Sequence, residues 1–568
     1  MQSTFHGLET ARRGMMTQQY ALHTVGHNIS NANTPGYTRQ RVNFTQTEPY
    51  PGAGMNKPRI PGHLGTGVKA GSIQRVRDQF LDIQYRNETN KVGYWNARYS
   101  AFEKMEDILN EPSEQGLSKQ IDLFWSSLQD LSVDPEDSGA RSVVRERGRF
   151  VAETFNYLHS SLSEIRHDYK NEIDVTQKEV NAILKSLDNV NAQIRQAEPH
   201  GYVTNDLYDD QDRLLDQLSR IVNIEVVREE SSGQPNDAAE GAVTVYLVDE
   251  QGNRYVEKDE DGNDKPVKLI DGTGQEKHMK MDIQFDDSKS FVTAFSFTNH
   301  DGTIRASTEL DKMPRGEMKA LIMAFGYGED ASSVRGLYPD MIAQLNTMAT
   351  EFATEMNNIH QLGFTLPGEN GEVTNGGLFF DLSDPNGVGA AKAIKVHDHI
   401  LSSRDHIAAA GVNTGALTVD ARAEYDTLMA GSPKNYSALH TLLKNSASFT
   451  NGQAKAFAGD GSNAKLLANM KDTLLNFNGD TATVTSFYQS VIGDMAVETQ
   501  EAVRMLSNSS ALQDSVDFRR QSVSNVSLDE EMTMMIQYQH AYNAAARNIT
   551  MIDEMLDKII NGMGVVGR

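Results

Sequence analysis

The 568-residue chain contains no cysteine, and long apolar runs are missing from it as well. Without thiols there are no disulfides, no thiolate metal sites and no cysteine nucleophile. No stretch approaches the roughly 18 to 20 apolar residues of a membrane span, and Met1 to Thr17 lack the apolar core of a cleaved signal peptide. We therefore expect no membrane partner. Composition favours the cytoplasm, although export without a cleaved signal would leave the same composition.

Positive charge is scarce, with 53 Lys and Arg against 78 Asp and Glu and a formal net charge of −25. Such a chain repels nucleic acids and anionic membranes, so neither is an expected partner. The first 100 residues are an exception, with 12 Lys and Arg against 5 Asp and Glu. This basic end needs an acidic neighbour. Asp529, Glu530 and Glu531 could supply one, but acids also suit the start of a helix, and we favour this second explanation.

The patterns that could carry chemistry are incomplete. His23 and His27 can share a helix face but lack the Glu of a zinc-binding H-E-x-x-H motif. The segment from Glu257 imitates half of a calcium-binding loop, but Lys268 stands where a bidentate Glu is required, so we expect a solvated hairpin turn. The glycines of residues 62–67 lack the GK[ST] of a phosphate-binding loop. The sequence predicts no catalytic residue, cofactor or metal.

Both ends of the chain carry a helix with a narrow apolar stripe. Apolar residues recur there at steps of three or four, the spacing that turns one helix face toward a partner. The front stripe comprises Phe5, Leu8, Met15, Leu22, Val25 and Ile29, and the back stripe comprises Leu528, Met532, Met535, Tyr538, Tyr542, Ile549, Ile552, Leu556, Ile559 and Met563. We expect these helices to pair. Because a lone pair with so narrow a contact is marginal, we expect neighbouring subunits to complete it, as in an assembly protein.

A turn follows the front helix, in the segment that contains Asn31, Asn33, Pro35, Gly36 and Tyr37. Proline presets φ for the second position of a type II turn and glycine accepts the positive φ of the third, so the spacing predicts this turn over residues 34–37. Alternation over residues 38–45 predicts a short strand with one basic face. The Pro- and Gly-rich residues 46–71 predict a loop.

The interior of the chain is mainly helical by pattern. Helical periodicity covers residues 72–225, with a long regular helix from Val151 to Ile194 that ends at Pro199 and Gly201 and a shorter helix that returns from Asp206 to Arg220. Strand-like alternation replaces it over residues 226–310. Helices resume over residues 315–360 and again from residue 485. Near the end, Ser527 and Glu530 predict a capping box for the last helix.

These patterns predict a mainly α fold with an inserted β-domain, arranged as a discontinuous multidomain rod whose terminal helices pair as a coiled coil. Residues 1–45 with 524–568 would form the terminal assembly domain, and residues 46–225 with 311–362 and 456–523 a helical bundle. Residues 226–310 would form the β-domain and residues 363–455 a second, mixed insertion, for which the sequence predicts no particular fold.

The segment from Asn28 to Tyr37 resembles the N-terminal signature of bacterial flagellar axial proteins, the family of rod, hook and hook-associated subunits. Four further segments are similar to the hook-associated members. They are Leu64 to Val68, Ser72 to Asp82, Asn205 to Asp212 and Arg519 to Met532. Tyr208, Asp209 and Asp210 depart from the family's usual run, so the resemblance assigns them no role.

The resemblance implies an extracellular structural subunit at the junction between flagellar hook and filament, exported through the flagellar type III channel and transiently cytoplasmic before export. It implies a ring of identical subunits that contacts hook protein and the third hook-associated protein. It also implies an export chaperone that binds the C-terminal helix. A second reading is another axial subunit, such as hook or distal rod protein. A third is a peptidoglycan-type glycosidase that uses two of the many carboxylates.

Overall fold

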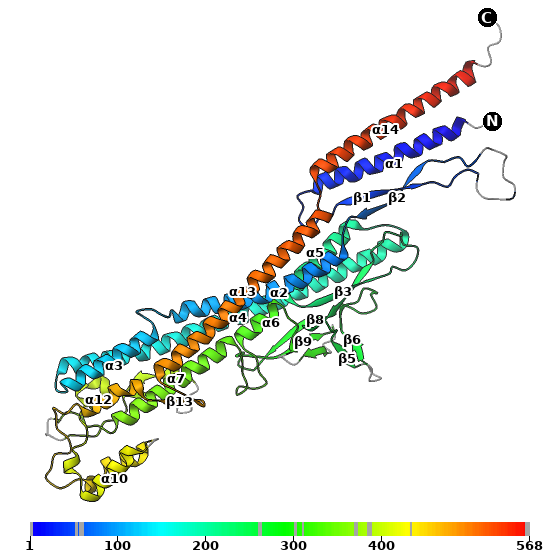
Figure 1. Ribbon diagram of the computed structural model, residues 1–568. Coiled ribbons are helices and arrows are strands. Elements are labelled where there is room, and N and C mark those ends of the chain that lie inside the picture. Colours follow the sequence, from blue (N-terminus) through cyan, green and yellow to red (C-terminus); the bar gives the residue numbers. More distant parts are fainter. Residues whose placement is uncertain are drawn as a thin grey trace.

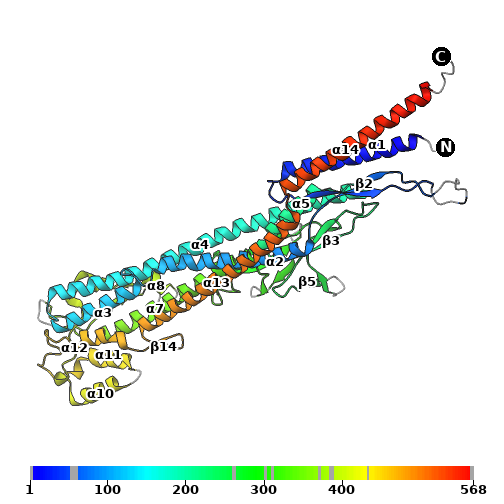
Figure 2. The same cartoon turned by 45° about the horizontal axis from the view of Figure 1, so that its top comes forward.

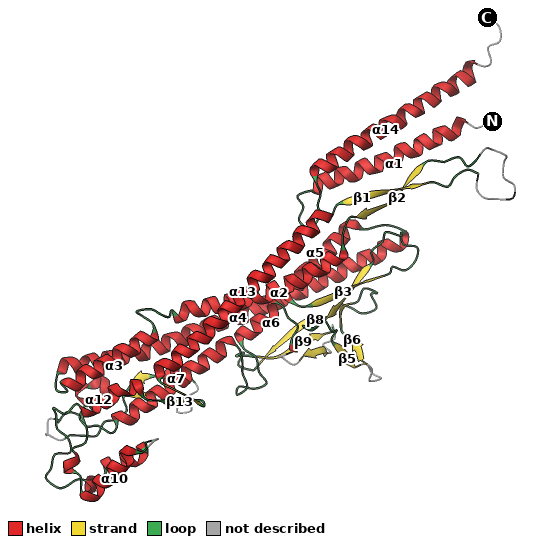
Figure 3. Cartoon of the chain, viewed as in Figure 1, coloured by secondary structure: helices red, strands yellow, loops and turns green. Residues whose placement is uncertain are grey.

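The computed structural model describes residues 4–51, 55, 62–258, 264–299, 304–308, 312–368, 373–382, 389–431 and 434–562. The chain forms an elongated body of long helices, and its first and last helices lie together at one end (Figure 1). Helices dominate, and the strands gather mainly on one side of the body (Figure 3). The predicted class, mainly α with a strand-rich segment, is confirmed.

The terminal end pairs two helices with a β-hairpin. Helix α1 (Thr4–Asn31) and helix α14 (Leu528–Asp557) lie side by side and run in opposite directions, with both chain ends at the tip (Figures 1 and 2). Strands β1 (Gln40–Gln46) and β2 (Val68–Arg75) pair antiparallel and lie along α1. The strand after the turn is confirmed. The loop prediction for residues 46–71 and the helical prediction from residue 72 are wrong where β2 forms, because its weak alternation gives no clear strand period.

Long helices build the body. They include α2 (Gln79–Leu109), α3 (Leu117–Val133), α4 (Ser138–Ala197), α5 (Asn205–Ile221) and α13 (Val484–Ser524). Asp137 caps the start of α4 by accepting hydrogen bonds from the amides of Gly139 and Ala140. A short 3₁₀ turn over Glu198–His200 ends it, and Gly201 follows with φ of 83°. The long helix, its end and the returning helix are all confirmed.

The strand-rich segment forms small antiparallel sheets. One sheet has the order β3-β4-β7, a second has the order β10-β9-β8, and β5 and β6 form a hairpin. The strands are β3 (Ile224–Glu229), β4 (Ala242–Leu247), β5 (Val256–Lys258), β6 (Asp264–Pro266), β7 (Lys268–Ile270), β8 (Lys280–Phe285), β9 (Val292–Thr298) and β10 (Ile304–Thr308). The calcium-loop-like segment is part of the β5–β6 hairpin, as predicted, although its tip lies outside the described residues.

The far end of the body is built from shorter elements. Helices α6 (Glu317–Phe325) and α7 (Leu337–His360) precede it. After them come β11 (Phe380–Asp381), α8 (Ala390–Ala393), β12 (Lys395–Val396), α9 (Asp398–Ser402), α10 (Val419–Ala430), α11 (Tyr436–Lys444), α12 (Ser462–Ala468), β13 (Leu475–Phe477) and β14 (Asp480–Ala482). A separate small core that includes Phe364, Leu417, Leu439 and Leu443 holds α10, α11 and the loops beside them, whereas buried residues of β11, α8, β12, α9, α12 and β13 belong to the same core as the long helices.

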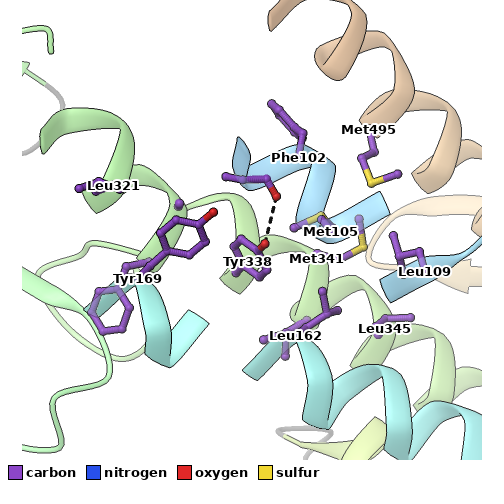
Figure 4. Close-up of a cluster of buried hydrophobic side chains, with 14 of the residues drawn as sticks. Phe102, Met105, Leu109, Leu162, Tyr169, Leu321, Tyr338, Met341, Leu345 and Met495 are labelled. Atoms are coloured by element: carbon purple, nitrogen blue, oxygen red, sulfur yellow. Dashed lines mark hydrogen bonds between the residues drawn. The ribbon is translucent and has the colours of Figure 1, made fainter. Parts of the chain in front are cut away.

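The main core runs through the body where α2, α4, α6, α7 and α13 meet. Figure 4 shows Phe102 and Met105 of α2, Met341 of α7 and Met495 of α13 in this cluster. The hydroxyl of Tyr338 donates to the carbonyl oxygen of Ala101 at 3.0 Å, which satisfies a phenol buried in apolar surroundings. Buried residues of strands β4, β7, β8 and β9 belong to the same continuous core as those of α4.

A candidate assembly joint between the terminal helices and the body

The predicted stripes lie along the contact between α1 and α14, but not all of their residues face it. Val25 is buried, and half-buried positions are Leu8, Met15, Leu22, Ile29, Met535, Tyr538, Tyr542, Ile549, Ile552 and Leu556. Gly7 permits a close approach, since a β-carbon there would lie 3.2 Å from Cδ1 of Ile552. The prediction that these two helices pair is confirmed.

Four predicted stripe residues point away from the contact in this chain: Phe5, Leu528, Met532 and Ile559 are exposed by 63%, 48%, 57% and 44%. Their assignment to the pairing face is therefore wrong, and Met563 lies outside the described residues. The reason at the start of α14 is that Glu531 takes the inner position of the helix, while Val526, just before the helix, is the buried apolar residue. The apolar pattern could not reveal this, because a buried carboxylate counts as a polar residue.

The most buried positions of α1 include polar ones that face the hairpin. Thr17, Ala21, Thr24 and Asn28 are 1–4% exposed. The hydroxyl of Thr17 donates to the carbonyl oxygen of Val68 in β2 at 3.1 Å. These four positions are three or four residues apart, which is the spacing of a buried helix face. An apolar pattern does not detect this face because three of the four side chains are polar.

The turn after α1 has the predicted form. The amide of Tyr37 donates to the carbonyl oxygen of Thr34 at 3.2 Å, and Gly36 has φ of 83°. Pro35 and Asn33 are exposed, whereas Asn31 is half-buried and its side chain donates to the carbonyl oxygen of His27 at 3.1 Å. These residues shape the turn that brings the chain from α1 back into β1.

Tyr37 fastens this turn to the end of α1. Its hydroxyl donates to Oδ1 of Asn28 at 2.8 Å and lies 2.9 Å from Nδ1 of His27. Asn28 is 1% exposed, and its Oδ1 also accepts from the amide of Gln40 at 3.0 Å. Burial, with the nearby carboxylates of Asp209 and Asp206, raises the pKa of Tyr37 well above its usual value, so the phenol stays neutral and keeps donating.

Arg39 connects α13, α14 and the hairpin. Its amide donates to the carbonyl oxygen of Ser524 at 2.9 Å, and its carbonyl oxygen accepts from the amide of Val76 at 2.8 Å. Its Nε pairs with Glu531 and its Nη1 pairs with Glu530, both at 2.8 Å. The acidic start of α14 therefore does pair with the basic front of the chain, contrary to the preferred explanation.

The predicted capping box is also wrong. Ser527 occupies the N-cap position of α14, but its side chain makes no capping hydrogen bond. Glu530, the expected partner in the box, reaches Arg39 instead. A guanidinium adds a full positive charge to the hydrogen bond with the carboxylate, which a backbone amide does not, and the local sequence pattern contains no sign of this distant arginine.

A buried ionic cluster lies next to this contact, between the hairpin, α2, α5 and α13. Its arginines are Arg75, Arg77, Arg86, Arg228 and Arg520, and its acids are Asp82, Asp209, Asp212, Asp216 and Glu240. Within this cluster the charges balance. The mutual pairing offsets part of the cost of removing so many charges from water.

Asp212 is the central acid of the cluster. One carboxylate oxygen accepts from Arg75 at 2.8 Å and the other from Arg86 at 3.0 Å, while Arg77 and Arg228 lie at 3.3 and 3.4 Å. Burial by itself would raise the pKa of Asp212, but the surrounding arginines hold it far below its usual range. The carboxylate therefore stays charged in acid that would protonate an ordinary aspartate.

The cluster also reaches the turn and the start of β1. The amide of Thr38 donates to Oδ2 of Asp209 at 3.1 Å, and Nη1 of Arg77 donates to the hydroxyl of Thr38 at 3.1 Å. Asp209 is one of the residues that depart from the family pattern, where the sequence assigned no role, and Asp212 ends the segment Asn205 to Asp212 that resembles the family. We call the contacts of Asn28, Tyr37, Arg39 and Glu531, together with the ionic cluster, the joint.

The histidines considered as metal ligands from the sequence do not form a metal site in the described part of the chain. Within the described ranges, no group of three or more His, Asp or Glu side chains could hold a metal ion. His23 is exposed, and His27 contacts Tyr37. No helix in the described part of the chain is long and apolar enough to cross a bilayer.

Comparisons with known proteins agree with this geometry. Residues 102–379 match the flagellar hook-associated protein FlgK helical domain, residues 8–38 match the flagella basal body rod protein family, and residues 520–562 match the flagellar basal body rod FlgEFG protein C-terminal family. The two rod-protein matches cover most of α1 and α14. The fold and the paired termini therefore define an axial protein of the bacterial flagellum.

Whole-chain relatives specify the member. Flagellar hook-associated protein 1 of Bacillus subtilis (strain 168) is 38% identical over 571 residues, which span 100% of both chains. The protein of that name from Escherichia coli (strain K12) is 25% identical, over 98% of this chain and 99% of its own. The flagellar hook junction protein FlgK from Burkholderia pseudomallei has a similar fold, with a TM-score of 0.53 at 15% identity over 78% of this chain and 100% of its own. The chain belongs to the flagellar hook-associated protein 1 (FlgK) family, whose members are structural proteins of the flagellum.

Proposed function

We propose that this chain forms the junction between hook and filament and polymerises through its terminal helices. The observation that carries this proposal is the face of α14 that α1 leaves uncovered, where exposed apolar side chains gather near both ends. Met532 and Ile536 lie near the start of the helix, and Met551, Met555 and Ile559 lie at its end and in the turn that follows, each 44–57% exposed. Exposed apolar patches are typical of a surface that a partner covers.

The partners follow from the family resemblance. Copies of this chain would form a ring, with hook protein on one side and the third hook-associated protein on the other. A cytoplasmic export chaperone would cover α14 before the chain leaves through the flagellar type III channel. The methionines of the uncovered face favour successive partners, since their flexible thioethers can repack against different surfaces.

The domain division of the sequence stays a proposal. Residues 1–45 with 524–568 would carry the axial contacts, and the strand-rich residues 226–310 and the mixed residues 363–455 would face outward. Two structural features support this division. The sheets lie on one side of the body (Figure 1), and the part of the mixed segment that includes Phe364, Leu417, Leu439 and Leu443 has a small core of its own.

We infer further that the chain is not an enzyme. A glycosidase needs one carboxyl that can donate a proton and a second that stays free for the sugar. The buried acids Asp209 and Asp212 are both engaged by Arg75, which leaves neither free. A place elsewhere along the axis, in hook or distal rod, is the remaining structural alternative.

Immunogold electron microscopy of isolated flagella tests the location. We would raise the antibody against residues 226–310 and use flagella of a strain lacking the gene as the control. One band where hook meets filament is the expected result. Label along the whole hook or rod would assign the chain to another axial position, and absence of label from the flagellum would reject the proposal.

A further inference from the structure

Helix α14 has one deeply buried anchor, and this anchor is charged. Among its described residues only Glu531 is buried, with 0% of its side chain exposed. Every other side chain of this 30-residue helix is half-buried or exposed in the isolated chain. Beside the half-buried contacts with α1, the one fully buried contact of this helix is therefore a single carboxylate.

Both oxygens of this carboxylate have fixed partners. Oε1 accepts from Nε of Arg39 at 2.8 Å, and Oε2 accepts from Nδ2 of Asn28 at 3.0 Å. Asn28 is itself held by Tyr37 and by the backbone of Gln40. Because these partners are themselves held in place, the carboxylate fixes where the start of α14 lies relative to α1 and Arg39.

The segment before α14 is where its direction is set. Residues 525–527 are not helical, and the flanking caps Asn525 and Ser527 are both extended, with ψ of 155° and 112°. Arg39 spans this break, since its amide holds Ser524 at the end of α13 and its side chain holds Glu531 in the first turn of α14. Without the carboxylate, the break would act as a pivot.

We propose that Glu531 is the positioning residue for assembly: its buried carboxylate, held by Arg39 and Asn28, fixes the direction in which the terminal helix pair leaves the body. Neighbouring subunits can share a continuous contact only if every copy presents this pair at the same angle. The inference rests on the proposed function for its biological meaning. Its structural part concerns the single chain and can be tested without the flagellum.

The chain offers a matched control on the same turn. Glu530 pairs with the same arginine at 2.8 Å, but 63% of its side chain is exposed, so water competes for it. Glu531→Gln keeps the shape of the side chain but turns an amide N–H₂ toward a donor, either Arg39 or Asn28. Glu530→Gln removes an equal charge without burying an unmatched donor. Comparing the two variants separates the effect of the buried carboxylate on helix position from the effect of losing one negative charge.

The direct measurement is a distance distribution between spin labels on α14 and α2 of the full-length protein. Asn543→Cys and Asn87→Cys introduce the label sites at exposed positions, and the absence of native cysteine keeps labelling specific. We expect a narrow distribution in the parent chain and in Glu530→Gln. In Glu531→Gln we expect a broad one, with the docked population reduced about tenfold or more relative to the pivoting one. Arg39→Gln should give the same broad distance distribution as Glu531→Gln. Its control is Arg41→Gln, which alters an exposed arginine and should give the narrow distribution of the parent chain.

A narrow distribution in Glu531→Gln would overturn the proposal, as would a broad one in the parent chain. Thermal unfolding of the body, followed by circular dichroism, guards against general misfolding and should be unchanged in both Glu variants. In cells that lack the native gene, Glu531→Gln should reduce filament-bearing junctions about tenfold, while Glu530→Gln should not. If the parent chain itself were absent from the junction, the proposed function would fail, yet the distance measurement would still decide the role of Glu531.

Discussion

Arg75 and Asp212 stand 137 positions apart in the sequence, yet Nη1 of Arg75 donates to Oδ2 of Asp212 at 2.8 Å. Arg75 ends β2 and Asp212 lies in the middle of α5, so this contact fastens the hairpin beside the terminal helices to the body. Both side chains are almost fully buried, at 0% and 2% exposed. The contact therefore lies where the loss of one partner would be most costly.

Replacing Asp212 with Asn should destabilise the fold by about 3 to 5 kcal/mol, because it leaves several buried arginines without their shared acid. Urea unfolding of the full-length protein measures this loss. Asp210→Asn is the matched control, since Asp210 lies in the same helix, pairs with Arg213 and is 53% exposed; its cost should stay within about 0.5 kcal/mol. Equal effects of the two variants would show that the buried cluster does not hold the hairpin to the body.

Stability should fall as the pH drops from about 6.5 to 4, because of His360. Burial lowers the pKa of this imidazole from 6.5 to about 4. Its Nδ1 lies 2.7 Å from the carbonyl oxygen of Gly377 and its Nε2 accepts from the amide of Ala408, which fits a neutral ring. Between the two pKa values the unfolded chain binds a proton that the folded chain does not, so acid favours unfolding by up to about 3 kcal/mol.

His360→Gln checks this assignment. Urea midpoints at pH 7.5 and pH 4.5 should differ clearly in the parent chain and much less in the variant, even though the variant is less stable at both. Asp212 should contribute little to this difference, because the stability that its depressed pKa provides is lost only as the pH falls through the usual pKa of 3.8 in the unfolded chain, below both of these pH values. An unchanged pH dependence in His360→Gln would assign the acid sensitivity to other groups.

Charge in the contact between α1 and α14 should abolish assembly while the body stays folded. Ile549→Asp and Leu556→Asp place a carboxylate at half-buried positions of this contact, where desolvation is unfavourable. Body stability should remain within about 0.5 kcal/mol of the parent chain. Circular dichroism and a motility assay measure the two effects separately. Loss of the body fold would contradict this division of labour.

Two further variants on α14 distinguish the pairing of α1 with α14 from assembly between subunits. Met551→Asp lies on the uncovered face, so it should leave the α1–α14 pair intact but reduce assembly. Asn548→Asp, at an exposed polar position, should change neither. Full assembly by Met551→Asp would mean that neighbours do not cover this face.

Gly36→Ala should destabilise the turn by about 1 kcal/mol. The φ of 83° at this position is costly for any residue with a β-carbon, whereas the space there is open, since the β-carbon would lie no closer than 3.6 Å to Arg213. Gly14→Ala, within α1 and with no atom nearby, should stabilise the helix instead. Amide hydrogen exchange over residues 28–40 reports the difference, and similar exchange in the two variants would contradict the backbone argument.

Local sequence predicted most of the helices and the turn because the needed information is contained in neighbouring residues. The regular spacing from Val151 to Ile194 predicts the long helix α4 wherever that helix packs. Pro35 and Gly36 predict their turn from their own backbone preferences. Strand β2 was missed because its stability comes from pairing with β1 and its own alternation is weak.

By itself, the sequence determined the helical termini, the pairing of α1 with α14 and the turn between α1 and β1, since periodicity and backbone preference act over a few residues. Only the tertiary structure decided that Glu531 is buried, that Glu530 leaves the predicted cap for Arg39, and that Asp209 and Asp212 become the acids of a buried cluster. The physical reason is that the energy of a charge depends on its partners and on its exposure to water. Most of the partners here lie more than a hundred positions away in the chain.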